Sequence, residues 1–534
     1  MMRREFLVRS VFVGFLILAT GGIVDAAGKE PGAVGMPSAG TVSARVFNPL
    51  AQRSARPPQE MRENLSRINP MRADVRAEEL RAGPPGYADR SVPGEPEVVR
   101  SRLQMSQPFQ DPMYPGISFT GWIPPDCHMA ASPSHVLLVV NSHFQAFNTS
   151  NGGAAFSAVS MGDWFADVLV DNEFVFDPKA VWDPDSKRFL ILGMSADFDT
   201  GASGWVISAS QTSDPAGSWW IYRLDGTLDG STPTSNWADY PGFGIDKKAV
   251  YMTANMFGPT SFAYTKCRII NKATLYAGGT LGWYDFFKLT DGSEYVFTLQ
   301  AAQSSPSNSF NFLINSKWGN SSTRLTVWKI TNPTSSKPTL KGWNLTVPSF
   351  SLPPNAKQKG GGIPINVGDD RLLNAVIRSG KLYTAHAIAA NWGSGTVSAA
   401  RWYELSVSGS TPKLLQSGTY GLDKYDYYYP VVLPDSAGNV YMVFNRSSQT
   451  EYVGVRATGR QAGDPVGQMD PSIQISAGKA NYRNLDGQGR NRWGDYNGIA
   501  LDAASTGKVW IFSEYAGSKT KWGTTFSRIT FSSE

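Results

Sequence analysis

Histidine, charge and the common catalytic motifs are scarce in this 534-residue chain, and each shortage excludes a class of protein. Only four histidines occur, and none has the His-x-x-x-His or His-Glu-x-x-His spacing of zinc hydrolases. A Gly-x-Ser-x-Gly nucleophile elbow and phosphate-cradling loops are also absent. Charged residues make up 17% of the chain and the net charge is +5, which argues against disordered, coiled-coil and nucleic-acid-binding proteins.

Cysteine is scarce too, and the two that occur leave two outcomes open. Cys127 and Cys267 lie far apart in the sequence, and an oxidising compartment would permit them to form a disulfide. Two buried, unpaired thiols are the alternative.

The first 27 residues have the pattern of an export signal. Basic residues at positions 3, 4 and 9 precede an apolar run from Val11 to Val24, and the small residues Ala26 and Ala27 suit cleavage. The pair Arg3-Arg4 resembles a twin-arginine signal, and the general secretory route is the alternative. The mature protein is therefore expected to be secreted, periplasmic or on the cell surface, with no transmembrane segment once the signal is removed.

Residues 28–110 differ in composition from the rest of the chain. They are rich in Pro, Arg, Glu and Ser and poor in aromatic residues. Such a segment cannot bury enough apolar surface to offset the entropy of ordering, so it is predicted to be a largely disordered linker or propeptide. A short helix between Pro58 and Arg81 is the one element expected in it.

What the chain does have is a repeated unit of short strands. An acid or aromatic residue at a tight turn is followed by an apolar strand, a polar turn and a second strand, most completely in residues 490–517. Short strands at regular spacing are typical of β-propellers. We predict an all-β, seven-bladed β-propeller with four-stranded blades over residues 111–534. Its units open at Asp126, Asp177, Asp239, Tyr295, Asp370, Tyr429 and Asp495.

Closure of the ring requires a strand from the other end of the chain. The last unit has material for one further strand, Thr524 to Phe531. We expect Ile117 to Ile123 to pair into the blade that contains Asp495, which would remove an open sheet edge.

Several stretches resemble a family of secreted, mostly uncharacterised bacterial β-propeller proteins. The family has motifs close to PPDTNG, DP, DYP and RWGDY. The matching stretches here are IPPDCHMAASPSHVLLVVN, DPKAVWDPDSKRFLIL, ADYPGFGIDKKAVYMTANMF and RNRWGDYNGIALDAASTGKVWIFSEYA. The resemblance covers roughly residues 119–517, and it implies secretion and a propeller but no reaction. Where the family has Thr-Asn-Gly this chain has Cys127, His128 and Met129, so His128 is the candidate donor or metal ligand there.

The candidate site is one end of the propeller channel, where the segments entering the inner strands meet. Five acids are expected there, and grouping them calls for cations or hydrogen-bond donors nearby. A calcium ion would supply the positive charge that the grouped acids need, and nearby arginines are the alternative. The alternative is that each Asp only structures its turn. The predicted ligand-binding residues are Asp126, His128, Asp177, Asp239, Asp370, Arg371, Tyr429, Arg492 and Asp495. The predicted metal ligands are Asp126, Asp177, Asp239 and Asp495.

Two functions remain open at the level of sequence. The first is a non-catalytic, monomeric binding protein that recognises a glycan or protein ligand at the loop face. The second is a glycoside hydrolase or polysaccharide lyase that uses channel-mouth Asp residues, with His128 or Tyr429 transferring protons. Five tryptophans are candidates either for stacking on sugar rings or for packing between blades, namely Trp122, Trp164, Trp237, Trp392 and Trp493.

Overall fold

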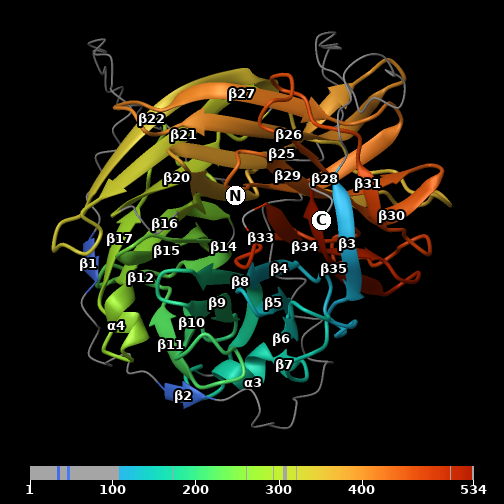
Figure 1. Cartoon of the computed structure of the whole chain (residues 1–534). Helices are drawn as coiled ribbons and strands as arrows, with labels where there is room; N and C mark the ends of the chain where they lie inside the picture. The colour runs from blue at the N-terminus through green and yellow to red at the C-terminus, as the bar shows by residue number, and fades with distance from the viewer. Residues whose placement is uncertain are drawn as a thin grey trace, which may run out of the picture.

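The computed structural model describes residues 33–35, 45–47 and 108–531, apart from 171, 260, 293, 305–308, 320 and 506. The predicted export signal and the predicted helix at Pro58 to Arg81 lie outside these residues. The described chain consists mainly of strands and turns, with β-sheets set around a common centre (Figure 1). This confirms the all-β class and the β-propeller arrangement.

Four of the sheets have four strands each. Two of them consist of β4 (His128–Ala131), β5 (His135–Val140), β6 (His143–Asn148) and β7 (Val159–Ser160), and of β18 (Gln300–Ala301), β20 (Phe310–Ser316), β21 (Ser322–Thr331) and β22 (Thr339–Phe350). The other two consist of β28 (Tyr425–Pro434), β29 (Val440–Ser448), β30 (Glu451–Arg460) and β31 (Ile473–Ser476), and of β33 (Gly498–Leu501), β34 (Lys508–Ala516), β35 (Trp522–Thr530) and β3 (Phe109–Pro115).

The remaining large sheets have five and ten strands. The five-stranded sheet consists of β8 (Phe174–Asp183), β9 (Arg188–Asp197), β10 (Ala202–Ser210), β11 (Trp219–Asp225) and β2 (Arg45–Phe47). The ten-stranded sheet consists of β1 (Ala33–Gly35), β14 (Trp237–Ile245), β15 (Ala249–Phe257), β16 (Phe262–Asn271), β17 (Trp283–Phe287), β19 (Gln303–Ser304), β24 (Asn374–Arg378), β25 (Lys381–Asn391), β26 (Thr396–Ser406) and β27 (Lys413–Tyr420). Only the two-residue β19 joins its halves, through parallel pairing to β14 and β24.

Four short strands and two short helices complete the described elements. The two-stranded sheets are β12 (Leu228–Asp229) with β13 (Thr232–Pro233), and β23 (Ile365–Asn366) with β32 (Asn491–Arg492). The helices are α3 (Met161–Phe165) and α4 (Lys272–Tyr276). In the part of the chain that the structure describes, no helix has the length and apolarity needed to span a membrane.

The inner strands form a closed ring around the centre. In the order β4, β8, β14, β18, β24, β28 and β33, each contacts the next, and β33 contacts β4. Glycine allows these strands to approach closely, because a Cβ at Gly242 of β14 would lie 2.7 Å from the carbonyl oxygen of Leu299. Inner-strand side chains therefore face a narrow channel.

The ring is closed by a strand from the N-terminal side, but not by the one predicted. β3 (Phe109–Pro115) pairs with β35, and the predicted Ile117 to Ile123 forms no strand. The chain leaves the sheet at Gly116, whose N–H donates to the carbonyl of Thr524, and it turns at Gly121, where φ is 97°. Closure by a strand from the N-terminal side was predicted correctly. The strand that closes the ring lies about one strand length earlier in the sequence than the predicted one.

Two strands in the predicted linker extend outer sheet edges. β1 pairs with β17 and β2 pairs with β11, each over three residues. A strand added at an outer edge covers backbone groups that would otherwise be free to pair with another molecule. These six residues of the predicted linker are therefore part of the sheets.

The packing between sheets settles two open questions from the sequence. Cys127 and Cys267 are buried free thiols, so they form no disulfide. Trp122, Trp164 and Trp493 are at most 4% exposed and pack in the interior, so they cannot stack on a sugar. Trp237 and Trp392 are partly exposed.

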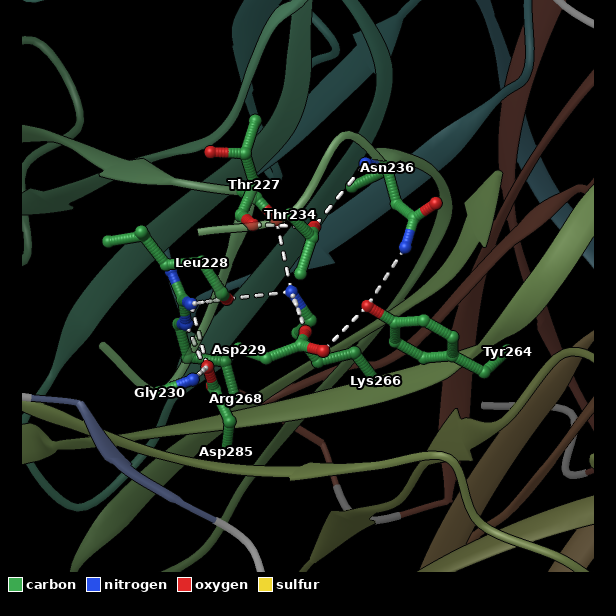
Figure 2. Close-up of polar contacts among 12 residues, drawn as sticks. Thr227, Leu228, Asp229, Gly230, Thr234, Asn236, Tyr264, Lys266, Arg268 and Asp285 are labelled. Carbon is green, nitrogen blue, oxygen red and sulfur yellow. Dashed lines mark hydrogen bonds and ion pairs between the residues drawn. The ribbon is translucent and has the colours of Figure 1, made fainter. Parts of the chain in front are cut away.

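A buried ionic network ties the segment after β11 to β16 and β17 (Figure 2). Lys266 Nζ lies 2.7 Å from Asp229 Oδ1, and Arg268 Nη2 lies 2.7 Å from Asp285 Oδ2. The side chains of Lys266, Arg268 and Asp285 have no exposed surface. Arg268 also donates to the carbonyls of Asp225 and Leu228, so each charge is balanced and hydrogen-bonded.

We predict that Asp285→Ala lowers the free energy of unfolding by about 3 to 5 kcal/mol, because it leaves the Arg268 guanidinium buried without its partner. Urea unfolding measures the change. The matched control is Glu294→Ala, which removes an exposed ion pair with Lys317 and should cost at most about 1 kcal/mol. Equal losses in the two variants would refute a special role for the buried pair.

Candidate functional site

The candidate site lies where the inner strands begin, and its framework is a repeated backbone conformation. Five residues, one for each of five inner strands, have φ between 48° and 55°. Asp126 and Thr298 shortly precede β4 and β18, and the others lie within the first half of β8, β14 and β28, namely Asp177, Tyr240 and Tyr429. Residues other than glycine seldom adopt this left-handed conformation. After Asp177, Tyr240 and Tyr429 the next residue is proline, and the strand register shifts there. The turns with an acid or tyrosine that were found in the sequence thus have a structural role, because they mark the left-handed residue at which the strand register shifts.

Asparagines from the second strands hold these turns, and sequence reasoning missed them. Asn141 donates to Asp126 Oδ2 at 2.5 Å, while its own Oδ1 accepts from the Asp177 N–H at 2.8 Å. Asn255 accepts from the Thr298 N–H in the same way, also at 2.8 Å. The signal was present, because an asparagine follows each of the apolar runs VLLVVN and VYMTAN.

Three of the predicted acids come together at the centre. Burial raises the pKa of Asp126 well above its ordinary value, and the charges of Asp495 and Asp177 raise it further. Arg492 opposes this shift, with Nη2 lying 3.2 Å from Asp495 Oδ2. We call Asp126, Asp177, Asp495 and the neighbouring Glu514 the acid cluster.

Glu514 of β34 was not predicted. It has no exposed surface, and neither of its carboxylate oxygens has a hydrogen-bond partner among the described residues. Burial raises its pKa well above the ordinary value, and the charge of Asp126 adds to the shift. Gly494 leaves room for it, because a Cβ there would collide with Oε1 of Glu514. Its sequence signal was an acid within the apolar strand VWIFSEYA.

Lys179 of β8 supplies positive charge inside the ring. Burial lowers its pKa to about 7, although Asp177, Asp126 and Asp495 all favour the charged form. Its Nζ lies 2.9 Å from the centroid of the Tyr496 ring. A cation over an aromatic face is stabilised by the ring quadrupole. Lys179 therefore balances part of the cluster's negative charge, and sequence reasoning missed this residue as well.

Hydroxyl and imidazole groups around the cluster are committed to the backbone. Tyr240, Tyr429 and Tyr496 donate to the carbonyls of Asp495, Asn366 and Pro178, respectively. His128 Nδ1 accepts from the N–H of Ala180 at 3.1 Å, and burial lowers the pKa of His128 well below its ordinary value. His128 is thus neutral, and Nδ1 is occupied as an acceptor.

Two chain segments pack together beside the acid cluster, where Tyr429 and Arg492 both donate to Asn366. β23 pairs with β32, and Gln358 exchanges two hydrogen bonds with the backbone of Tyr482. We call residues 356–367 and 481–492 the cap. Asp126, Asp177 and Asp495 are 1%, 7% and 7% exposed. A polymeric substrate could not reach them in this conformation.

The other predicted site residues lie around the cluster. Asp239 is 5% exposed, and its side chain accepts from the Tyr240 N–H. The residue of β14 in the left-handed conformation is Tyr240 and not Asp239. Arg371 pairs with Asp369 at 2.6 Å and lies over the ring of Tyr240.

Asp370 is engaged elsewhere. Its carbonyl accepts from Ser316 and contacts His386 Nδ1. Burial first, and then the charge of Asp369, raises the pKa of Asp370 well above its ordinary value. The contacts described for Asp370 are thus made with β20 and β25.

A metal site is not evident from the side-chain arrangement. Within the described ranges, no group of three or more His, Cys, Asp or Glu side chains is placed to hold a metal ion. Positive charges beside the acids come from Lys179, Arg492 and Arg371.

Comparison with known proteins gives the fold context only. No family model matches the chain, and no curated protein does either. Among solved structures it is similar to the Hadza microbial sialidase Hz136, with 12% identity, a TM-score of 0.35, and coverage of 75% of this chain and 74% of that one. It is also similar to Drosophila semaphorin 1b, with 8% identity, a TM-score of 0.37 and coverage of 80% and 88%. A third is the GH93 α-L-arabinofuranosidase of Fusarium graminearum, with 9% identity, a TM-score of 0.36 and coverage of 77% and 97%. At these scores the likeness carries no argument about function.

We predict that Glu514→Gln becomes more stabilising, relative to the wild type, as the pH rises from 5 to 8. A carboxyl whose pKa is raised in the folded state contributes stability at low pH, and that contribution is lost as the pH rises through the folded-state pKa. Glutamine mimics the protonated form at every pH, so it avoids the loss. Urea unfolding at pH 5, 6, 7 and 8 measures the trend. The control is the exposed Glu294→Gln, and a Glu514→Gln effect independent of pH would contradict the buried charge.

Proposed function

We propose that the protein is a secreted or cell-surface, non-catalytic binding protein that recognises a glycan or protein ligand at the loop face of its propeller. The observation that carries this proposal is the burial of the acid cluster. Glycosidases place two carboxyl groups on either side of the scissile bond in an accessible cleft. Here the acids are at most 7% exposed, and the cap packs beside them through Asn366.

The loop face offers contact residues for such a ligand. Four large apolar side chains lie in segments that lead into inner strands, and each is exposed: Val170 at 42%, Tyr295 at 48%, Ile363 at 38% and Leu485 at 41%. Exposed apolar and aromatic side chains among polar loops suit contact with a sugar face or a protein partner. The acid cluster then serves to hold the loops in position.

We also propose that the propeller has seven blades. Each inner strand in the ring from β4 to β33 begins a run of four antiparallel strands, if β14–β17 and β24–β27 are counted separately. Their connection through the two-residue β19 supports that separation. Export of the mature chain rests on the N-terminal signal pattern alone.

The alternative is a carbohydrate-active enzyme that opens its cap to reach the acids. The loop-face proposal predicts that a recognised polysaccharide raises the unfolding midpoint without being cut, since a ligand that binds only the folded state stabilises it. Thermal unfolding against a polysaccharide panel, followed by product analysis, measures both. Tyr295→Ala should reduce the shift, and the control Val466→Ala, at a side chain 75% exposed outside these segments, should not.

Cutting would favour the enzyme, provided that Asp495→Asn abolishes it. The control for that variant is Asp214→Asn, at an exposed hairpin acid. Cutting that persists in both variants would point to a contaminant instead. If no polysaccharide shifts the unfolding midpoint, protein ligands become the test of the loop face. Their binding to the immobilised wild type is then compared with their binding to immobilised Tyr295→Ala.

A calcium ion among Asp126, Asp177, Asp239 and Asp495 is a separate proposal. It predicts that a chelator lowers the unfolding midpoint, that added calcium restores it, and that Asp495→Asn removes the dependence. Differential scanning fluorimetry with EDTA and with calcium measures this. Midpoints that do not respond would leave Lys179 and Arg492 as the counter-charges.

A further inference from the structure

A second hollow lies at the opposite end of the channel from the acid cluster, where the inner strands end. Its volume is about 360 Å³, which is within the range of small-molecule pockets, about 300 to 1,000 Å³. Fourteen of its eighteen lining residues are apolar, and they come from several inner strands, for example Ala131, Val181, Ile245, Leu433 and Leu501. We call this hollow the exit pocket.

The exit pocket contains one cation that is not paired. The acidic residue that lines the pocket, Asp502, already has partners. Its Oδ2 lies 3.2 Å from Arg528 Nη1, and its Oδ1 accepts from the Ala504 N–H. The basic residue of the pocket, Arg378 of β24, is partly exposed, and no hydrogen bond or ion pair of its guanidinium is found among the described residues. Burial lowers the pKa of Arg378, and Asp435 is the main charge opposing that shift.

Asp435 does not neutralise Arg378 by direct contact. Its Oδ1 accepts from the N–H groups of Ala437 and Asn439, and its Oδ2 accepts from Asn439 Nδ2. The donors of Arg378 are therefore available at the pocket. A guanidinium fork binds a carboxylate well, especially where water is partly excluded.

The depth of the exit pocket limits what can bind. Gln303 and Val376 line both this pocket and a smaller hollow of about 20 Å³, which His128 and Lys179 border. The smaller hollow has room for about one water molecule. A ligand therefore stops near Val376, and its charged group is left to Arg378 and not to Lys179.

We propose that the exit pocket binds a small monocarboxylate with an apolar body. The carboxylate pairs with Arg378, and the apolar body lies against side chains such as Val181, Leu433 and Leu501. A single unpaired cation in an apolar wall selects one negative charge and disfavours polyanions. This site is separate from the loop face and does not depend on the function proposed for that face.

Isothermal titration calorimetry of the purified chain tests the proposal with octanoate as the probe. We expect saturable binding of one octanoate per chain. Octanol, which has the same body without the charge, should bind about tenfold more weakly or worse, and acetate should show no binding. No octanoate binding, or equal binding of octanol, would overturn the proposal.

Variants separate the charge from the cavity. Arg378→Gln should weaken octanoate binding about tenfold or more while leaving octanol unchanged, and Arg378→Lys should restore part of the affinity. Arg483→Gln, at an exposed arginine of the cap, is the control and should bind as the wild type does. Val376→Trp should block both probes by filling the neck. Full octanoate affinity in folded Arg378→Gln, or in folded Val376→Trp, would refute the site.

Discussion

The structure depends on keeping carboxylates buried at the centre of the ring. Taking a charge out of water costs several kcal/mol unless partners replace the lost hydration. Asp126, Asp177 and Asp495 meet this requirement with Lys179, Arg492 and Asn141. Asn141, which follows β5, also accepts from the N–H of Asp177 on β8, so it joins two neighbouring blades. The partners that stabilise the acids therefore also help to hold the blades together.

This arrangement separates the two ends of the channel. At the end where the inner strands begin, charge, tyrosine hydroxyls and the cap fill the space, and the backbone there is fixed in a left-handed conformation. At the end where they finish, the side chains are small or aliphatic and a hollow remains. In the functions that we propose, the sealed end positions the loops for recognition, and the open apolar end accepts a small molecule. The two ends can thus carry different ligands without competing.

The strands were largely predictable because their signal is local. The turn at Asp502 to Gly507 and the strands on either side follow the alternation of apolar runs and turn residues. The closing strand was displaced because Ile117 to Ile123 looks like a strand in isolation, and only the pairing with β35 decides which segment is used. Lys179 and Glu514 were missed for a similar reason. Each is a single charged residue in an apolar run, and the partners that make it tolerable lie far away in sequence.

The repeated acids illustrate how a sequence pattern can combine two causes. Five turns share the same positive φ, yet their residues are Asp126, Asp177, Tyr240, Thr298 and Tyr429. Since tyrosine and threonine serve there as well, the conformation is the common requirement and the negative charge is not. Asp is favoured at such positions because its short side chain tolerates the left-handed region and bonds to nearby backbone. Charge matters where an acid is present without that backbone reason, as at Asp495 and Glu514, neither of which has a positive φ. Those two positions are where a chemical role of the cluster is best sought.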